Sequence, residues 1–134
     1  MLRSLLGVIT LGILVVAPGI AMPLQLVVEG EPRATIVLAD QPSAAAREGA
    51  ALLVAQIERI SGARLPVVKE GALGGLNIVD RSITVATPGA APHVFVLVGE
   101  SALARQLGAT GEGLGAGGIL IRTLPNALVL LGTD

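Results

Sequence analysis

Apolar runs rich in β-branched residues alternate with one helical repeat in the first half of the chain. The runs at 24–28 and 34–39 predict a lead-in strand and a second strand, and the run at 65–68 predicts a third. Between the second and third runs, apolar side chains recur at three- and four-residue steps, which predicts a long helix with one buried face. The residues on that face are Ala46, Ala50, Leu53, Ile57 and Ile60. A strand, a helix and a strand in this order make a right-handed crossover if the two strands are parallel.

Turn-forming residues bound this helix on both sides. Asp40 or Ser43 can cap its first turn, where Pro42 also fits, because an N-cap side chain accepts a hydrogen bond from a free backbone N–H. Gly62 follows Ser61 and suits the left-handed conformation that ends many helices. The helix is therefore predicted to end at Ser61.

The second half of the chain begins with an unbroken apolar run at 94–98. Such a run is typical of a strand that is buried on both faces, so we expect it at the centre of the sheet. A short helix is predicted over 102–107, with Ser101 as its cap and Gly108 as its end.

Two further apolar runs, at 118–123 and 127–131, predict a C-terminal hairpin. The stretch 71–92 is rich in glycine and proline and predicts loops with one short strand at 83–86. Together the elements predict an α/β fold (α+β, sandwich-like). Its features are a mixed sheet, a long helix after the second strand, and a short helix before the hairpin.

The first residues of the chain have the pattern of a secretory signal. One positive charge precedes the apolar run 5–16, and Gly19 and Ala21 occupy the small positions of an A-x-A type cleavage site. We therefore expect a signal peptide at 1–22 and a secreted, periplasmic or envelope-located domain at 23–134, without stable membrane insertion after cleavage. The alternative is a retained membrane anchor, because 5–21 approaches the shortest membrane-spanning length.

Composition narrows the choice of partners. The length of 134 residues allows one domain after the signal, with 52% hydrophobic residues available for its core. The net charge is -1 and the basic residues are scattered, so we expect no nucleic-acid partner. One Phe without Trp or Tyr leaves no platform for stacking on sugars or bases, and the absence of Cys excludes disulfides and thiol chemistry.

Two short motifs resemble known sites but stand in the wrong context. Residues 113–118 fit G-x-G-x-x-G, yet they follow a predicted helix and open a strand, whereas a dinucleotide loop follows a strand and opens a helix. Gly99-Glu100-Ser101 lies between a strand and a helix like a nucleophile elbow, but no Asp followed by His comes after it. A turning loop and a helix cap are the simpler interpretations.

Four titratable residues remain as candidates for a catalytic or metal-binding role. His93 is the only histidine, so it cannot form a His-pair metal site, and no nucleophile is available for it to activate. Asp40, Glu100 and Asp134 each follow a predicted strand, where α/β sheets gather ligands. Paired acids hydrolyse glycosides only at fixed separations, and solvated turn residues are the alternative. We assign no catalytic, cofactor-binding or metal-binding residue.

The amino-acid sequences of several segments, and the order in which they occur, carry a family resemblance. The segments are Thr35–Ala39 leading into Pro42-Ser43 and the helix with Ala50, Leu53 and Ile57; the helix end and strand Ile60–Val68; the strand end Val98–Ser101; and the hairpin Gly118–Thr123 with Leu128–Asp134. In this order they resemble the non-catalytic N-terminal domain that precedes the barrel in family 67 α-glucuronidases. They resemble more distantly the domain before the barrel in family 20 β-hexosaminidases.

The resemblance implies an accessory domain of a secreted, carbohydrate-active glycoside hydrolase, whose catalytic acids lie in a barrel that this chain lacks. It also implies a C-terminally truncated fragment, because the family's final covering helix, which follows the turn at 132–134, is missing. The implied partner is a catalytic barrel, from downstream residues or a separate chain, together with polysaccharide. The residues also leave open a stand-alone exported module that binds glycan or protein, and an independent hydrolase.

Overall fold

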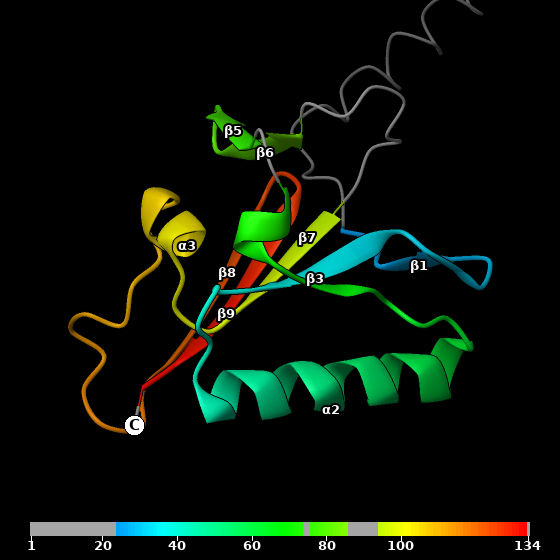
Figure 1. The fold of residues 1–134 in the computed structure, drawn as a ribbon, viewed down its shortest axis with the longest axis horizontal. Helices are drawn as coiled ribbons and strands as arrows, with labels where there is room; N and C mark the ends of the chain where they lie inside the picture. The colour runs from blue at the N-terminus through cyan, green and yellow to red at the C-terminus, as the bar shows by residue number, and fades with distance from the viewer. Residues whose placement is uncertain (1–23, 74–75, 86–93, 134) are drawn as a thin grey trace, which may run out of the picture.

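A five-stranded mixed sheet forms the centre of the molecule (Figure 1). The computed structural model describes residues 24–73, 76–85 and 94–133. In spatial order the strands are β4 (Val67–Lys69), β3 (Ala34–Leu38), β7 (Val94–Val98), β9 (Ala127–Gly132) and β8 (Ile119–Leu124). The first four are parallel to one another, and β8 pairs antiparallel with β9. These strands confirm the predicted α/β class, the mixed sheet and the central position of 94–98.

The long helix α2 (Ala44–Ser61) follows β3 as predicted. Ser43 is its N-cap, with the Ser43 hydroxyl accepting a hydrogen bond from the Ala46 N–H at 3.1 Å. Gly62 ends the helix at φ +79°, and its N–H donates to the Glu58 carbonyl. Local sequence therefore sets both ends of the helix.

The predicted apolar face of α2 is wrong at its C-terminal end. Ala46, Ala50 and Val54 are buried, but Ile60 is 83% exposed. The reason is the direction of the buried face, because its buried residues follow one another at steps of four. At about 3.6 residues per turn, Ile60 lies about 120° around the helix from Val54 and so points away from the sheet.

The lead-in strand is shorter than the predicted run at 24–28. A small hairpin takes its place, formed by β1 (Val27–Val28) and β2 (Glu31–Pro32). Glu29 and Gly30 form its turn with φ of +51° and +77°. Two successive positive φ values suit the tight hairpin turns that match strand twist, which explains why β1 pairs with β2 directly after it.

The face of the sheet opposite α2 carries three small elements, η2 (Glu70–Leu73), the β5–β6 hairpin and α3 (Ala102–Gln106) (Figure 1). The hairpin consists of β5 (Leu76–Val79) and β6 (Ser82–Val85), where the sequence predicted only one short strand. The Asn126 side chain accepts from the Ile83 N–H at 2.9 Å and donates to the Ile83 carbonyl at 2.7 Å. This pair of bonds attaches the hairpin to the turn between β8 and β9.

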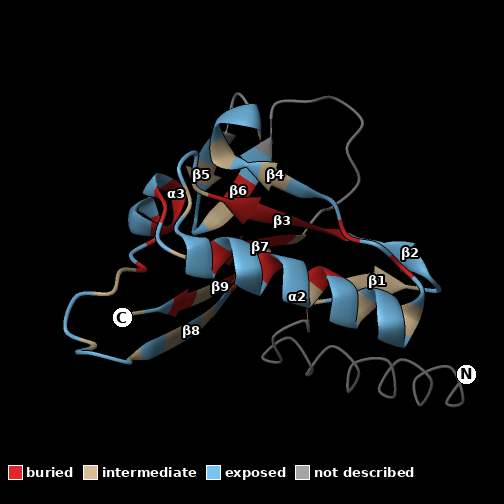
Figure 2. Cartoon of the chain, turned by 60° about the horizontal axis from the view of Figure 1, so that its bottom comes forward, coloured by how far each residue is buried: buried red, intermediate tan, exposed pale blue. Residues whose placement is uncertain are grey.

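Two apolar cores lie on the two faces of the sheet. On the α2 side, Ile36 and Val96 are fully buried beneath the helix. On the other side, Phe95, Leu97 and Val129 pack with α3 and with Ile83 of the hairpin. Figure 2 shows the buried residues concentrated on β3 and β7, while much of β8 is exposed.

Some sequence predictions concern residues outside the described ranges. The signal peptide at 1–22, His93 and Asp134 all lie there. Within the described ranges, no helix combines the length and apolar character needed to cross a membrane.

Candidate functional site

An open hollow of about 1110 Å³ lies where the parallel strands end. Because β3, β7 and β9 run in the same direction, the residues that follow them meet at one edge of the sheet, which is where α/β folds commonly bind ligands. The polar residues that line the hollow are Asp40, Ser43, Glu70, Glu100, Ser101, Arg105 and Thr133. The structure thus gathers Asp40 and Glu100, as the strand order predicts.

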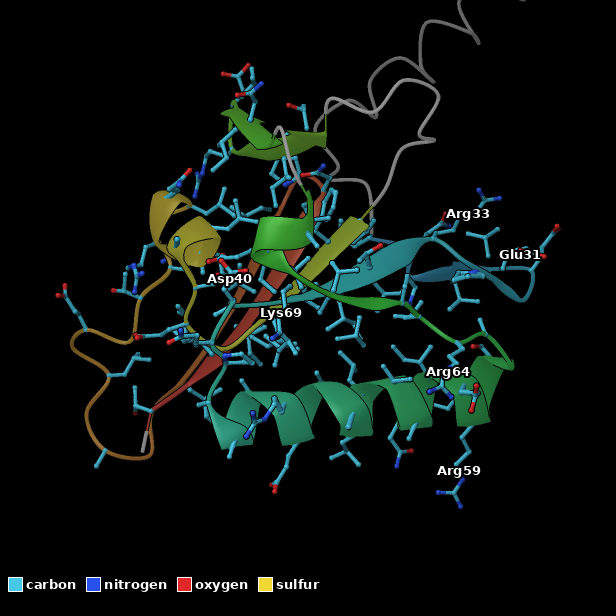
Figure 3. The ribbon with its side chains drawn as sticks, viewed as in Figure 1. Glu31, Arg33, Asp40, Arg59, Arg64 and Lys69 are labelled. Atoms are coloured by element: carbon cyan, nitrogen blue, oxygen red, sulfur yellow. The ribbon has the colours of Figure 1, made fainter. Side chains whose placement is uncertain are left out.

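Asp40 connects the end of β3 to η2. Its carboxylate Oδ1 accepts a hydrogen bond from the Gly71 N–H at 2.9 Å. A Cβ at Gly71 would lie only 2.6 Å from that oxygen, so the backbone approaches the carboxylate more closely than any other residue would permit. Asp40 does not cap α2, because the structure assigns that role to Ser43. Figure 3 shows Asp40 far from Arg59 and Arg64, which lie near the other end of α2.

Glu70 connects β4 to α3. Its two carboxylate oxygens accept from the Ala102 N–H at 3.3 Å and the Leu103 N–H at 3.1 Å. The Ser101 hydroxyl accepts from the Ala104 N–H at 3.0 Å, so the first turn of the helix is satisfied. Ser101 is therefore a helix cap, as predicted. Sequence reasoning missed Glu70, whose only signal was its position two residues after the predicted strand 65–68.

Glu100 and Thr133 anchor the glycine-rich loop. Glu100 Oε1 accepts from the Gly111 N–H at 2.9 Å. The Thr133 hydroxyl accepts from the Gly118 N–H at 2.8 Å and donates to the Gly115 carbonyl. The loop follows α3 and precedes β8, in the order predicted, which is not the strand-to-helix order of a dinucleotide site.

These contacts define the chemistry of the polar residues that line the hollow at the ends of β3, β7 and β9, which we call the polar edge. Asp40, Glu70 and Glu100 all accept hydrogen bonds from backbone N–H groups of neighbouring segments. Such carboxylates order loops and helix starts. Within the part of the chain that the structure describes, no group of three His, Cys, Asp or Glu side chains could hold a metal ion, and no buried side-chain nitrogen or oxygen lacks a partner.

The hollow continues as an apolar trough over the α2 face of the sheet. We call it the α2–β8 trough; its lining comprises Ala45, Val98, Ile119, Ile121 and Leu130. Ile119 and Ile121 of β8 are 74% and 66% exposed. Leu130, paired with Ile121 on β9, is half-buried. The helix covers β3 and β7 but leaves β9 and β8 open on this face.

Gly99 determines how closely α2 approaches the sheet at the head of the trough. It directly follows β7 at φ +81°, and a Cβ there would lie 2.8 Å from the Ala46 Cβ. Any other residue would have to push α2 away from β7 or adopt a strained backbone. Gly99 is therefore a packing residue, and the nucleophile-elbow pattern around it has a structural explanation.

Comparison with known proteins yields no match to this chain, whether with family models, curated proteins or solved structures.

Proposed function

We propose that this chain is a non-catalytic N-terminal accessory domain of a secreted glycoside hydrolase, of the α-glucuronidase-like or hexosaminidase-like type. Its role is structural: it packs against a catalytic barrel and supports it. The observation that carries the proposal is the α2–β8 trough, where Ile119 and Ile121 remain exposed while Ile36 and Val96 on the same face of the sheet are buried beneath α2. Exposed aliphatic patches of this kind mark protein contacts.

The dimensions of the trough suit one helix. Two strands spaced about 4.8 Å apart offer about 10 Å of floor, which is the diameter of a helix with its side chains. β9 ends at the edge where α2 begins, so a helix that follows β9 would lie beside α2. The resemblance to the hydrolase domains implies a covering helix at this place in the chain.

The polar edge supports a non-catalytic role. Asp40 and Glu100 bind backbone N–H groups of two different loops. A glycosidase pair instead needs two acids that face a bound sugar from opposite sides. In the proposed enzyme, the acids that cleave the glycoside belong to the barrel.

The decisive experiment is the mass of the native exported product. An antibody against residues 44–59, which form most of α2, would detect it. We expect a product large enough to include a barrel, or a barrel-sized partner that co-purifies with the chain. A product the size of residues 23–134 that binds no hydrolase would contradict the proposal.

Activity of that purified product provides a second readout. Substituting Asp40→Asn or Glu100→Gln should leave kcat for an aryl glycoside unchanged, because both acids serve the accessory domain. A large loss of kcat with unchanged thermal unfolding would favour the independent-hydrolase interpretation instead.

A stand-alone exported module that binds protein is the second candidate. The aliphatic character of the trough favours it over a glycan-binding module, since sugar sites usually rely on aromatic side chains and the chain has one Phe. A monomeric native product that melts sharply and captures a protein without hydrolase activity would support this alternative.

A further inference from the structure

Strand β8 is an unprotected edge of the central sheet. It pairs with β9 on one side, and within the described residues no strand pairs with its other side. Its six residues, ILIRTL, contain no proline and no lysine. The opposite edge strand, β4, has only three residues, is preceded by Pro66 and ends in Lys69. Short strands, proline and lysine are common protections against edge pairing, and β8 has none of them.

The hairpin register shows which backbone groups of β8 are free to pair. Thr133 donates its N–H to the Gly118 carbonyl at 2.9 Å, and the alternation of an antiparallel ladder continues to the Leu124–Ala127 pair. Residues 118, 120, 122 and 124 therefore bond to β9. Ile119, Ile121 and Thr123 direct their N–H and C=O groups away from the sheet.

The same residues also expose their side chains. Ile119 and Ile121 are 74% and 66% exposed, and Thr123 is exposed as well. Isoleucine and threonine favour strands because branched side chains pack well across a pleated surface. The outer edge of β8 thus offers both free ladder groups and strand-forming apolar side chains.

We propose that β8 pairs antiparallel with β8 of a second copy of this chain, across a twofold axis at Ile121. The three outward-facing residues are symmetric about Ile121, so Ile119 of each copy lies opposite Thr123 of the other. The Ile121–Ile121 pair and the two Ile119–Thr123 pairs each exchange two backbone bonds, which gives about six hydrogen bonds across the axis. The central sheets of the two copies become continuous.

Neighbouring registers fit less well. Moving the twofold axis by one residue toward the C-terminal end of β8 places Arg122 opposite Arg122 of the second copy, and like charges directly opposed are destabilising. A shift toward the N-terminal end leaves Thr123 without an opposing residue inside β8. In the proposed register Arg122 instead lies beside Leu120, whose side chain can pack on the aliphatic stem of the arginine. This interface does not depend on the proposed function.

Cysteine cross-linking of the full chain tests the interface directly. The chain has no cysteine, so Ile121→Cys supplies a single thiol. Across the axis the two Cα atoms would lie about 5.5 Å apart, within the range for a disulfide. We expect a covalent dimer on mild oxidation, formed about tenfold faster than with Ile60→Cys, since disulfide exchange depends on access between the sulfurs.

Ile60 is the matched control because it is an 83% exposed isoleucine on α2, away from β8. Equal cross-linking of the two variants would overturn the proposal, since it would reflect only random collision.

Charge substitution provides an independent test by sedimentation of the full chain. Ile121→Lys and Ile121→Glu should each weaken dimerisation about tenfold, because each places like charges on the axis. Mixing the two variants should restore a heterodimer. The exposed position of Ile121 leaves the fold intact, which circular dichroism would verify. A monomeric wild-type chain, or dimerisation unaffected by either charge, would overturn the proposal.

Discussion

The covered and uncovered halves of the sheet differ in burial although both are apolar. In β3 all five residues are buried, and β7 is buried from Phe95 to Val98. In β9 buried and half-buried residues alternate, and in β8 exposed and half-buried residues alternate up to the last position. Helix α2 covers only β3 and β7. The apolar sequence of a strand therefore predicts that its faces pack against other elements. The structure shows that α2 provides this packing for β3 and β7 but not for β9 and β8.

Two isoleucines on the same face offer the strongest contrast between these halves. Ile36 of β3 is fully buried beneath α2, whereas Ile121 of β8 is 66% exposed in the trough. Ile36→Ala should lower the free energy of unfolding by about 2 to 5 kcal/mol through lost burial and a residual cavity. Ile121→Ala should change it by less than about 0.5 kcal/mol. Urea unfolding of both variants measures the difference.

Equal losses for the two variants would show that the trough is covered in the folded chain. That result would remove the basis for a docked partner.

Gly99 tests how tightly α2 is held over the covered half. Gly99→Ala should destabilise the fold by about 1 to 3 kcal/mol, because it adds a strained φ and a contact of 2.8 Å with Ala46. Gly30→Ala is the matched control, with a similar φ of +77° and nothing within 4 Å of its Cβ. Thermal unfolding of both separates steric contact from backbone strain, and identical losses would contradict the packing role.

Glu70 tests the layer on the opposite face. Glu70→Ala should lower the free energy of unfolding by about 1 kcal/mol, since two N–H groups in the first turn of α3 lose their acceptor. Glu48→Ala, an exposed change on α2, should have almost no effect. Amide hydrogen exchange would show faster exchange at Ala102 and Leu103 in the first variant only. Unchanged protection there would show that Glu70 is dispensable.

The smallest effect on stability is expected in the trough itself. Ile119→Thr combined with Ile121→Thr keeps branched side chains on β8, so the free energy of unfolding should stay within about 0.5 kcal/mol of the parent. Self-association measured by light scattering should fall, because the exposed apolar surface is reduced. A marked loss of stability would mean that these side chains pack within the chain and that the two halves are alike.

Local signals predicted much of this fold. The Gly62 end, the Ser101 cap and the C-terminal hairpin depend on neighbours a few residues away, and the sequence predicts all three. Ser43 was one of two predicted caps for α2, beside Asp40. The β5 strand was missed because its pairing with β6 lies within a glycine-rich stretch. The spacing places Ile60 on the buried face because three- and four-residue steps define a broad stripe, and the sheet contacts only the part of it that carries Ala46, Ala50 and Val54.

The candidate site was less predictable than the fold. The strand order implied that Asp40 and Glu100 meet at one edge, and they do line the same hollow. The bond from Glu70 to α3 joins residues 32 and 33 positions apart, so no local pattern could reveal it. No local pattern showed that Ile119 and Ile121 would be exposed, because they look like core residues in sequence.

The order of synthesis differs from the order of strands in space. β9 is the last described strand along the chain, yet it lies inside the sheet, with β7 on one side and β8 on the other. Until residue 132 has been made, β7 has an open, strongly apolar edge exposed to other chains. A chain of this topology completes its sheet only after synthesis of β9, which favours holding it unfolded until then.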